Sequence, residues 1–395
     1  MPRKPRPKQV ALAMPIVVPW MAQCMDGILE YAREHDGWNL LTSPPTLIGA
    51  METTLTVAGL KGWPGDGVLA FINDRKEAGD AKRLGIPVVS LGGVLRDPSL
   101  PRVMIDHYAT GRLAAEHLLE RGFRRLAFYG ISGPWYARQR REAFVTRAAE
   151  AGVACEVFEQ KPVTNPRISW QRRLRPLDDW LRTLKPPVGI MAVHDYRARI
   201  VLEECLRLGL RVPHDVAIIG VDNDTTVCEH CRPALSSVSR SARRHGYEAA
   251  AMLDRLMAGE TPEALDVAVP PDGVAARRST DVIAVDDPHV SAVVHYMHDH
   301  LGEIEQITDA LAHAPISRRL LEKRFQESLG CTPYHYLCRL RVEQAKRLLA
   351  SDERPKLHSV ALQCGFSSPD RMRLIFLRLT GKAPSAYCRA KRTGG

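Results

Sequence analysis

The sequence predicts a two-lobed α/β domain followed by an all-α domain that contains two helix-turn-helix motifs. Three observations carry this prediction. Residues 10–270 alternate short apolar runs with amphipathic stretches, residues from 304 onward show only helical periodicity, and two C-terminal segments repeat one residue pattern. With 395 residues the chain is too long for one ordinary hydrophobic core, so two or three domains are expected.

The first part of the chain has the pattern of parallel sheets that are covered by helices on both faces. Strands are expected at seven short apolar runs: 10–18, 67–72, 86–91, 125–130, 155–159, 188–193 and 216–222. Helical periodicity separates them at 25–34, 110–122, 140–152, 198–209 and 247–259. Continuously apolar strands joined by helices of this length are typical of βαβ units, and the segment is long enough for two lobes.

Polar and aromatic side chains follow several of these strands. Ligands of open α/β sheets bind beyond the carboxyl ends of the strands, where such side chains converge. Charged and amide groups hydrogen-bond the hydroxyls of a sugar, and aromatic rings pack on its apolar face. Each residue taken singly could equally cap a strand or form a surface ion pair. Together they predict a cleft for a small polyhydroxylated ligand, lined by Trp20, Trp135, Arg140, Asp195, Asp222 and Asn223.

Two C-terminal segments repeat the spacing of Phe, Gly, Pro and Tyr: FQESLGCTPYHY (325–336) and FLRLTGKAPSAY (376–387). Around each copy, apolar residues recur at helical spacing and supply the buried face of a helix. Ser317 is a good N-cap and Gly330 a good helix stop. We therefore expect helix-turn-helix motifs at about 304–329 and 357–380, with a joining helix at about 333–350.

Two such motifs on one rigid helix would suit successive major grooves of DNA. The joining helix would span roughly 27 Å, comparable with the ~34 Å turn of B-DNA. Residues 289–395 hold 17 Lys and Arg against 10 Asp and Glu, which favours a polyanionic partner. A helical bundle with a charged exterior is the alternative. The predicted DNA contacts are Ser317, Arg318, Arg319, Glu322 and Lys323 in the first motif and Ser368, Asp370, Arg371 and Arg373 in the second.

Composition argues against several other classes. The chain is 45% apolar and 25% charged, has no apolar run long enough for a membrane span and has no secretory cleavage site, so we expect a folded cytoplasmic protein. Nine scattered cysteines indicate reduced thiols. Cys228, His230 and Cys231 lack a second ligand pair, so a loop or core role is favoured over a metal site. No catalytic or nucleotide-binding motif is present, so neither enzymatic activity nor a cofactor is expected.

The C-terminal segments resemble the DNA-binding domain of AraC-type transcription regulators. The resemblance is carried by GFSSPDRMRLIFLRLTGKAPSAYCR (365–389) and by SRRLLEKRFQESLGCTP (317–333). Two stretches upstream are similar to the periplasmic-binding-protein-like effector domain of LacI-type repressors: DHYATGRLAAEHLLERGFRRLAFYG (106–130) and VPHDVAIIGVDN (212–223).

This order of domains is similar to that of the XylR type of xylose-operon activators, which GIMAVHDYRAR (189–199) also resembles. The resemblance covers almost the whole chain. It implies that Arg140, Asp195 and Asp222 contact sugar hydroxyls, with Trp20 and Trp135 lining the cleft.

The expected function is a sugar-responsive transcription regulator that binds double-stranded DNA. We expect an activator of an operon for xylose or another monosaccharide, acting as a homodimer with RNA polymerase as its partner. One alternative is a solute-binding or carbohydrate-processing protein without sequence-specific DNA binding; another is a regulator that senses a non-sugar metabolite. The expected domains are a disordered basic tail (1–9), a ligand-sensing domain (10–275), a linker (276–290) and a DNA-binding domain (291–395).

Overall fold

The computed structural model forms two compact units, Met1–Val282 (unit 1) and Ile283–Gly395 (unit 2), each with its own hydrophobic core. None of the helices within the described residues is both long and apolar enough to cross a membrane. The structure describes residues 6–14, 19–35, 37–42, 55–95, 100–161, 167–282, 284–285, 287–349 and 356–387.

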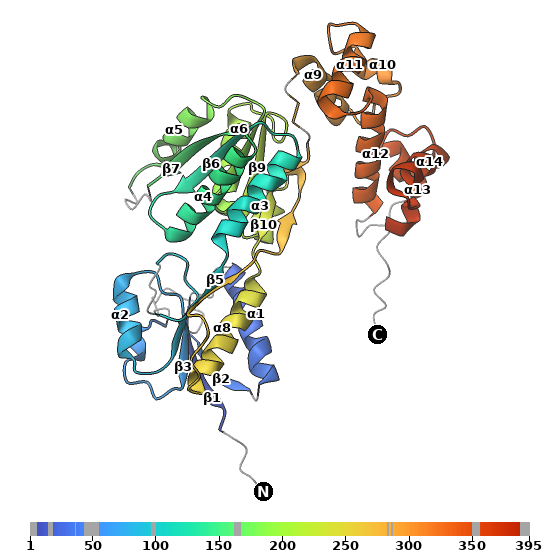
Figure 1. Cartoon of the computed structure of the whole chain (residues 1–395). Coiled ribbons are helices and arrows are strands. Elements are labelled where there is room, and N and C mark those ends of the chain that lie inside the picture. The colour runs from blue at the N-terminus through green and yellow to red at the C-terminus, as the bar shows by residue number, and fades with distance from the viewer. Residues whose placement is uncertain are drawn as a thin grey trace. The chain divides into compact units, whose positions relative to one another are not determined.

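The N-terminal lobe of unit 1 is built on a parallel six-stranded sheet (Figure 1). Its strands follow the order β11 (Asp266–Val269), β5 (Arg102–Ile105), β4 (Val88–Ser90), β3 (Gly67–Ala70), β1 (Lys8–Ala13) and β2 (Trp38–Thr42). One face packs against α1 (Pro19–Glu34) and α8 (Ala242–Met257). The other packs against η1 (Ala58–Leu60) and α2 (Arg75–Arg83).

Helices α1 and α8 approach each other closely at two glycines. A Cβ atom at Gly27 would lie 1.9 Å from the backbone oxygen of Arg243. One at Gly246 would lie 1.9 Å from the backbone oxygen of Cys24. Only glycine therefore allows the two backbones to touch at this crossing.

The C-terminal lobe of unit 1 has a second six-stranded sheet, in which only β12 runs antiparallel to its neighbour. The order is β12 (Gly273–Ala275), β10 (Ser236–Ser239), β9 (Val216–Val221), β8 (Val188–Ala192), β6 (Arg125–Ile131) and β7 (Ala154–Gln160). Its helices are α3 (His107–Glu120), α4 (Trp135–Glu150), α5 (Trp170–Leu181), α6 (Asp195–Arg207) and the short α7 (Thr225–Cys228) (Figure 1).

The chain passes between the two lobes from β5 to α3, from β10 to α8 and from β11 to β12. The second and third connections are tied together, because the hydroxyl of Ser241 lies 2.6 Å from the carbonyl oxygen of Pro270. His107 is the first residue of α3, directly after the first connection, and Arg240 lies on the second. Both therefore stand where the lobes meet.

All seven predicted strands coincide with strands of the structure, which confirms the α/β prediction. Strands β2, β5, β10, β11 and β12 and helices α2, α5 and α7 were not predicted. The unpredicted strands are short, and β10 reads SSVS although three of its four residues are buried. Buried serines paired with other polar groups do not register as an apolar run.

Four of the predicted helices begin six, three, five and three residues too late, since α1 starts at Pro19, α3 at His107, α4 at Trp135 and α6 at Asp195. Their first turns face the cleft between the lobes and carry polar or aromatic residues. The apolar period that reveals a helix therefore starts later than the helix does.

The predicted domain limits need two corrections. Strand β1 begins at Lys8, so Lys8 and Gln9 do not belong to a disordered tail, and residues 1–5 lie outside the described residues. The short helix η2 (Arg278–Thr280) belongs to unit 1, because Ser279 and Thr280 are buried and Ser279 donates to the carbonyl of Ile218. The predicted linker therefore starts inside unit 1.

Unit 2 is all helical and contains both predicted motifs. The first motif consists of α10 (Ile307–Leu311) and α11 (Arg318–Leu329), preceded by α9 (Pro288–Asp299). The joining helix is α12 (Pro333–Leu349). The second motif consists of α13 (Leu357–Gln363) and α14 (Pro369–Thr380), followed by η3 (Pro384–Tyr387).

The repeated Phe-Gly-Pro-Tyr pattern has a structural role in both motifs. Phe325 and Phe376 are fully buried, and each packs edge-on against the Tyr of its own copy. Gly330 and Gly381 end α11 and α14 in the left-handed conformation, with φ of 66° and 71°. Each copy therefore marks the end of the motif's second helix and the start of the next one.

Candidate functional site

Unit 1 contains a cavity of 330 Å³ between its lobes, which we call the interlobe pocket. This volume suits a small ligand. Polar and aromatic side chains from both lobes line it, among them Trp20, Phe71, His107, Tyr136, Arg140, His194, Asp195, Asp222, Asp224 and Arg240.

Asp222 lies at the end of β9 in an unusual backbone conformation. Its φ of 108°, followed by 50° at Asn223, puts two non-glycine residues in the left-handed region. Such angles persist only where the surroundings hold them, and they concentrate at functional sites. Here they hold the carboxylate of Asp222 3.0 Å from Nη1 of Arg240 and 3.7 Å from Nη2 of Arg140.

Arg240 connects the two lobes through this carboxylate. It belongs to the β10–α8 connection, and its guanidinium lies 3.8 Å from the centre of the Trp20 ring on α1. Stacking on Trp20 and pairing with Asp222 fix its orientation. Its Nε is buried and has no hydrogen-bond partner among the described residues.

Arg140 and His107 line the pocket, and each has a further unpartnered polar atom. The Arg140 side chain is 2% exposed, and it donates to the carbonyl of Val193 while its Nε has no partner among the described residues. Nδ1 of His107 is also buried and has no hydrogen-bond partner among the described residues. Burial and the charges of Arg140 and Arg240 hold the pKa of His107 well below its usual range, so the ring is neutral. Buried polar atoms without a partner are costly, and ligand hydroxyls, which both donate and accept, would satisfy them.

Asp195 is held by hydrogen bonds at the start of α6. One carboxylate oxygen accepts from the hydroxyl of Ser237 at 2.6 Å, and the other accepts from the backbone N–H of Asp224 at 2.8 Å. Burial, reinforced by the charge of Asp222, raises the pKa of Asp195 to about 8. The group is therefore mostly protonated at neutral pH and can donate as well as accept.

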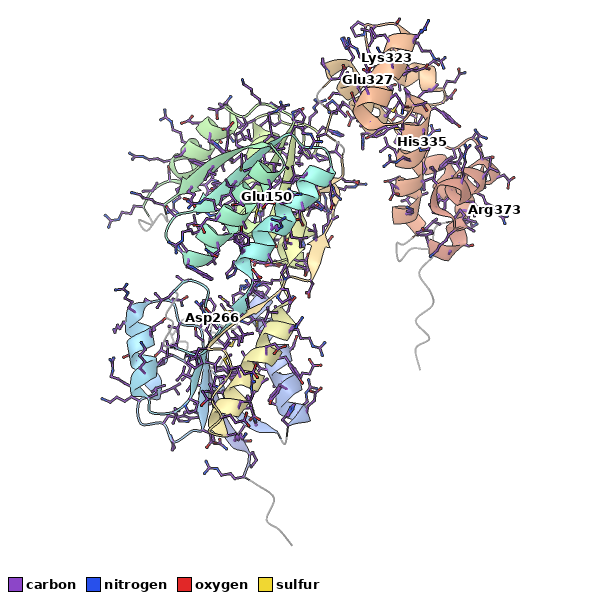
Figure 2. All side chains as sticks on the ribbon, viewed as in Figure 1. Glu150, Asp266, Lys323, Glu327, His335 and Arg373 are labelled. Atoms are coloured by element: carbon purple, nitrogen blue, oxygen red, sulfur yellow. The ribbon has the colours of Figure 1, made fainter. Side chains whose placement is uncertain are left out.

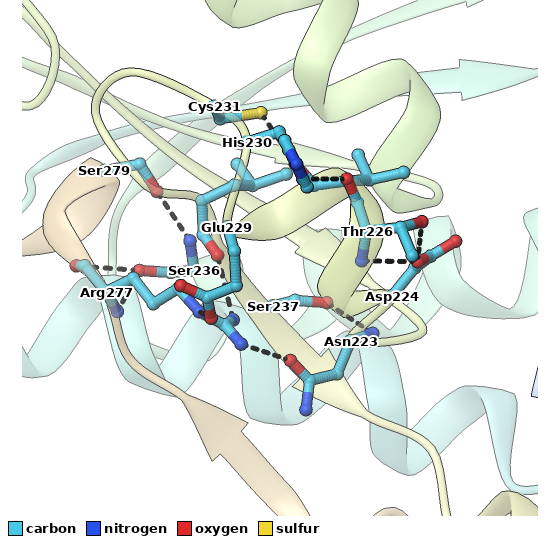
Figure 3. Close-up of polar contacts among 12 residues, drawn as sticks. Asn223, Asp224, Thr226, Glu229, His230, Cys231, Ser236, Ser237, Arg277 and Ser279 are labelled. Atoms are coloured by element: carbon cyan, nitrogen blue, oxygen red, sulfur yellow. Dashed lines mark hydrogen bonds and ion pairs between the residues drawn. The ribbon is translucent and has the colours of Figure 1, made fainter. Parts of the chain in front are cut away.

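Four of the six predicted ligand residues lie together in the pocket: Trp20, Arg140, Asp195 and Asp222. Trp135 does not line it but packs edge-on against His107, with ring centres 5.8 Å apart. Asn223 is also turned away, because its side-chain oxygen accepts from Arg277 at 2.9 Å, as Figure 3 shows. Trp135 therefore contacts a pocket residue without lining the pocket, whereas the side chain of Asn223 is engaged outside it.

Two of the pocket residues that the sequence prediction missed follow strands that it also missed. His107 comes two residues after β5, and Arg240 comes directly after β10. Phe71 directly follows β3. The sequence prediction contained this strand but ended it at residue 72, one residue beyond Phe71. The rule that ligands bind at strand ends would have found all three residues if the strands had been correctly placed.

Cys228, His230 and Cys231, weighed above as metal ligands, have other partners. The thiol of Cys231 lies 3.2 Å from the carbonyl of Val227, and Nδ1 of His230 lies 2.8 Å from that of Thr226 (Figure 3). No group of three or more His, Cys, Asp or Glu side chains in the described part of the chain could hold a metal ion.

The first motif of unit 2 has its charged residues on the exposed side of α11. Ser317 caps the helix by accepting from the N–H of Leu320. Arg318 pairs with Glu322 at 2.8 Å, and Lys323 with Glu327 at 3.6 Å; Figure 2 shows Lys323 and Glu327 side by side. Arg319 is exposed and has no ion-pair partner among the described residues.

The predicted DNA contacts of the second motif lie at the start of α14. Ser368 caps the helix by accepting from the N–H of Arg371. Arg371 donates to the hydroxyl of Tyr334 on α12 at 2.7 Å, so its guanidinium points back towards the joining helix. Asp370 and Arg373 are exposed, and Arg373 extends away from the helix (Figure 2).

The two motifs are also linked through the buried Arg341 of α12. It donates to the carbonyl of Ile304, just ahead of the first motif, and its guanidinium lies 5.8 Å from the Phe366 ring in the turn of the second. The spacing of the motifs is therefore set by packing as well as by the length of α12.

Three family models match the chain. Residues 18–167 match the periplasmic binding proteins and sugar binding domain of the LacI family, and residues 115–280 match a periplasmic binding protein-like domain. Residues 311–390 match a helix-turn-helix domain. The first two cover the residues of the interlobe pocket, and the third covers both motifs except for all but the last residue of α10.

Relatives and a solved structure match over most of the chain. The xylose operon regulatory protein of Escherichia coli strain K12 is 35% identical over 379 residues, which cover 92% of this chain and 93% of that protein. Its namesake in Haemophilus influenzae is 28% identical over 329 residues, or 82% and 84%.

The structure of the xylose-binding transcription activator xylR superposes with a TM-score of 0.74 at 31% identity and covers 97% of this chain and 98% of that one. Fold, domain order and identity over nearly the full length agree. The chain therefore belongs to the family of xylose operon regulatory proteins and is a sugar-responsive, DNA-binding transcription regulator.

Proposed function

We propose that this chain activates transcription of a carbohydrate-utilisation operon when a monosaccharide, xylose or another, binds in the interlobe pocket. The observation that carries the proposal is the set of unpartnered polar atoms on residues that line the pocket: Nε of Arg140, Nε of Arg240 and Nδ1 of His107. A ring of hydroxyls would satisfy them, and the aromatic rings of Trp20, Phe71 and Tyr136 provide apolar contact surface.

The ligand would act by holding the lobes together. Trp20 belongs to the N-terminal lobe and Asp222 to the C-terminal lobe, so a sugar that touches both stabilises the closed arrangement. A ligand shifts such an equilibrium only by the difference in its affinity for the two arrangements. Closure would then change how unit 2 is presented to DNA.

The proposal further comprises a cytoplasmic homodimer that assembles through unit 1 and contacts RNA polymerase at the promoter. Two copies would read a pair of half-sites, which raises affinity and selectivity together. The pocket is a binding site, and we assign it no enzymatic step.

A thermal-shift screen with a panel of pentoses and hexoses tests whether a monosaccharide binds to the chain, and which one. A sugar present at 100 times its dissociation constant should stabilise unit 1 by about 2.7 kcal/mol. Asp222→Asn should abolish the shift, because Arg140 and Arg240 lose the carboxylate that orients them. Asp215→Asn, which breaks the ion pair with Arg211 outside the pocket, is the matched control and should keep it.

The screen also separates the alternatives. Sequence-selective DNA binding without a response to any monosaccharide would favour a non-sugar effector. A sugar response that does not change the affinity for any DNA sequence would contradict the regulatory role.

A further inference from the structure

The most exposed face of α14 is partly apolar, and neither the core of unit 2 nor the predicted DNA contacts account for it. Met372 and Phe376 point inward and are buried. On the opposite face, Asp370, Leu374 and Leu377 follow one another at i, i+4 and i+7. Leu374 is 61% and Leu377 50% exposed. Two large apolar side chains therefore stand at the centre of the outward face of the motif's second helix.

The repeat places different residues at the same positions of the first motif. With the 51-residue offset between Phe325 and Phe376, the residues that correspond to Asp370, Leu374 and Leu377 are Arg319, Lys323 and Gln326. All three are exposed on α11. The two motifs thus share a backbone arrangement but present a polar face in one copy and a partly apolar face in the other.

Positive charge surrounds the apolar pair. Arg373 lies on one side of it and Arg378 on the other, both exposed, and the exposed Lys382 follows the helix. Such a frame complements the phosphates on either side of a DNA groove. These basic residues favour DNA over the apolar surface of a protein as the partner of this face. An apolar protein surface would have to bury or exclude their charges.

The apolar group that base pairs present in the major groove is the 5-methyl group of thymine. Leu374 and Leu377 are three residues apart, which corresponds to about 4.5 Å along the helix axis. Successive base pairs are about 3.4 Å apart. The two side chains can therefore reach two neighbouring base pairs, while Asp370, one turn nearer the N-terminus, can accept from the amino group of cytosine or adenine.

We propose that Leu374 and Leu377 read the methyl groups of two neighbouring thymines, so that the operator is bipartite. The segment under α14 contains the thymines, and the segment under α11 contains guanine or adenine, because Arg and Lys bind guanine and Gln binds adenine. This inference rests on the DNA-binding function and adds its base preference.

The test starts from duplexes that the full chain selects from a random library. Thymines in the segment under α14 are then replaced by deoxyuracil, which lacks only the methyl group. Each replacement should weaken binding about fourfold, and both together about 15-fold, as expected for the loss of one buried carbon each. The measurement is the ratio of dissociation constants for the two duplexes, taken at one salt concentration.

Substitutions test whether this ratio of dissociation constants depends on the two leucines. Leu374→Ala and Leu377→Ala should bring the ratio of dissociation constants close to one. Neither change should unfold unit 2, because both side chains are exposed. Leu362→Ala is the matched control, because Leu362 is 55% exposed but lies on α13. It should leave the ratio unchanged.

Two results would overturn the inference. One is equal affinity of the unaltered chain for the thymine and deoxyuracil duplexes. The other is a ratio that survives Leu374→Ala and Leu377→Ala while activation in a reconstituted transcription assay is lost, which would assign the leucines to a protein partner. Failure to select any duplex would contradict the DNA-binding function itself, whereas selection with equal affinities contradicts only this inference.

Discussion

At the scale of single residues, Asp195 and Asp222 follow neighbouring strands but have different surroundings. Asp222 faces two guanidinium groups, whereas Asp195 is enclosed by a hydroxyl, a backbone N–H and apolar neighbours. Burial together with the charge of Asp222 raises the pKa of Asp195 to about 8. Asp195 can therefore hold a proton at neutral pH although a second carboxyl group lies in the same pocket.

This pKa predicts how stability depends on pH. In the pH range between about 4 and 8 the folded chain keeps a proton on Asp195 that the unfolded chain releases. The contribution of Asp195 to the free energy of unfolding is thus complete below pH 4 and falls as pH rises towards 8. Asp195→Asn carries no such proton, so the variant should gain stability relative to the unaltered chain over this range.

Urea unfolding from pH 5 to pH 8 measures the difference between the two proteins, which removes the contributions of all other titrating groups. Asp26→Asn, at an exposed position of α1, serves as the control and should follow the profile of the unaltered chain. Parallel profiles for Asp195→Asn and the unaltered chain would contradict the protonation of Asp195.

At the scale of elements, contacts between helices decide which positions tolerate change. Helices α1 and α8 meet at Gly27 and Gly246, where backbone touches backbone and no side chain can move aside. Glycine in α2 is different: a Cβ atom at Gly79 would lie 3.4 Å from the flexible end of Arg83. The same substitution should therefore have opposite effects in the two helices.

We expect Gly246→Ala to destabilise unit 1 by roughly 1–3 kcal/mol or more, because α8 must shift away from α1. Gly79→Ala should stabilise it by about 0.8–1 kcal/mol through helix propensity. Chemical denaturation followed by circular dichroism measures both changes. A neutral Gly246→Ala would show that the helices can separate without cost and would refute the close crossing.

At the scale of the whole molecule, the chain divides into two units with separate cores. Unit 2 contains both motifs, and Asp287 ties its first helix to α11 by capping α9 and pairing with Arg324 at 3.0 Å. It has the contacts that an independently folding domain requires.

Residues 283–395 expressed alone should therefore fold and bind the duplexes selected by the full chain. Binding should be weaker, because dimerisation through unit 1 no longer holds two copies together, and it should not respond to any sugar. A thermal melt and a gel-shift titration with and without the monosaccharide measure these properties. A sugar response of unit 2 alone would place the effector site outside the interlobe pocket.

Much of this organisation could be predicted from the sequence. The repeat that contains Phe325 and Phe376 indicated both motifs and the helix between them, because caps, glycine stops and helical periodicity are local properties of the chain. Strand ends likewise indicated Arg140, Asp195 and Asp222, which the structure brings together in one pocket.

Only the tertiary structure decided which side chains share the pocket. Arg240 is far from Trp20 in sequence and comes after a serine-rich strand that lacks an apolar pattern, yet the crossover between lobes places it on the Trp20 ring. Asn223 and Trp135 have the right chemistry but turn to Arg277 and His107. Residue type and strand order are local information, whereas the direction of a side chain depends on partners that only the folded chain brings near.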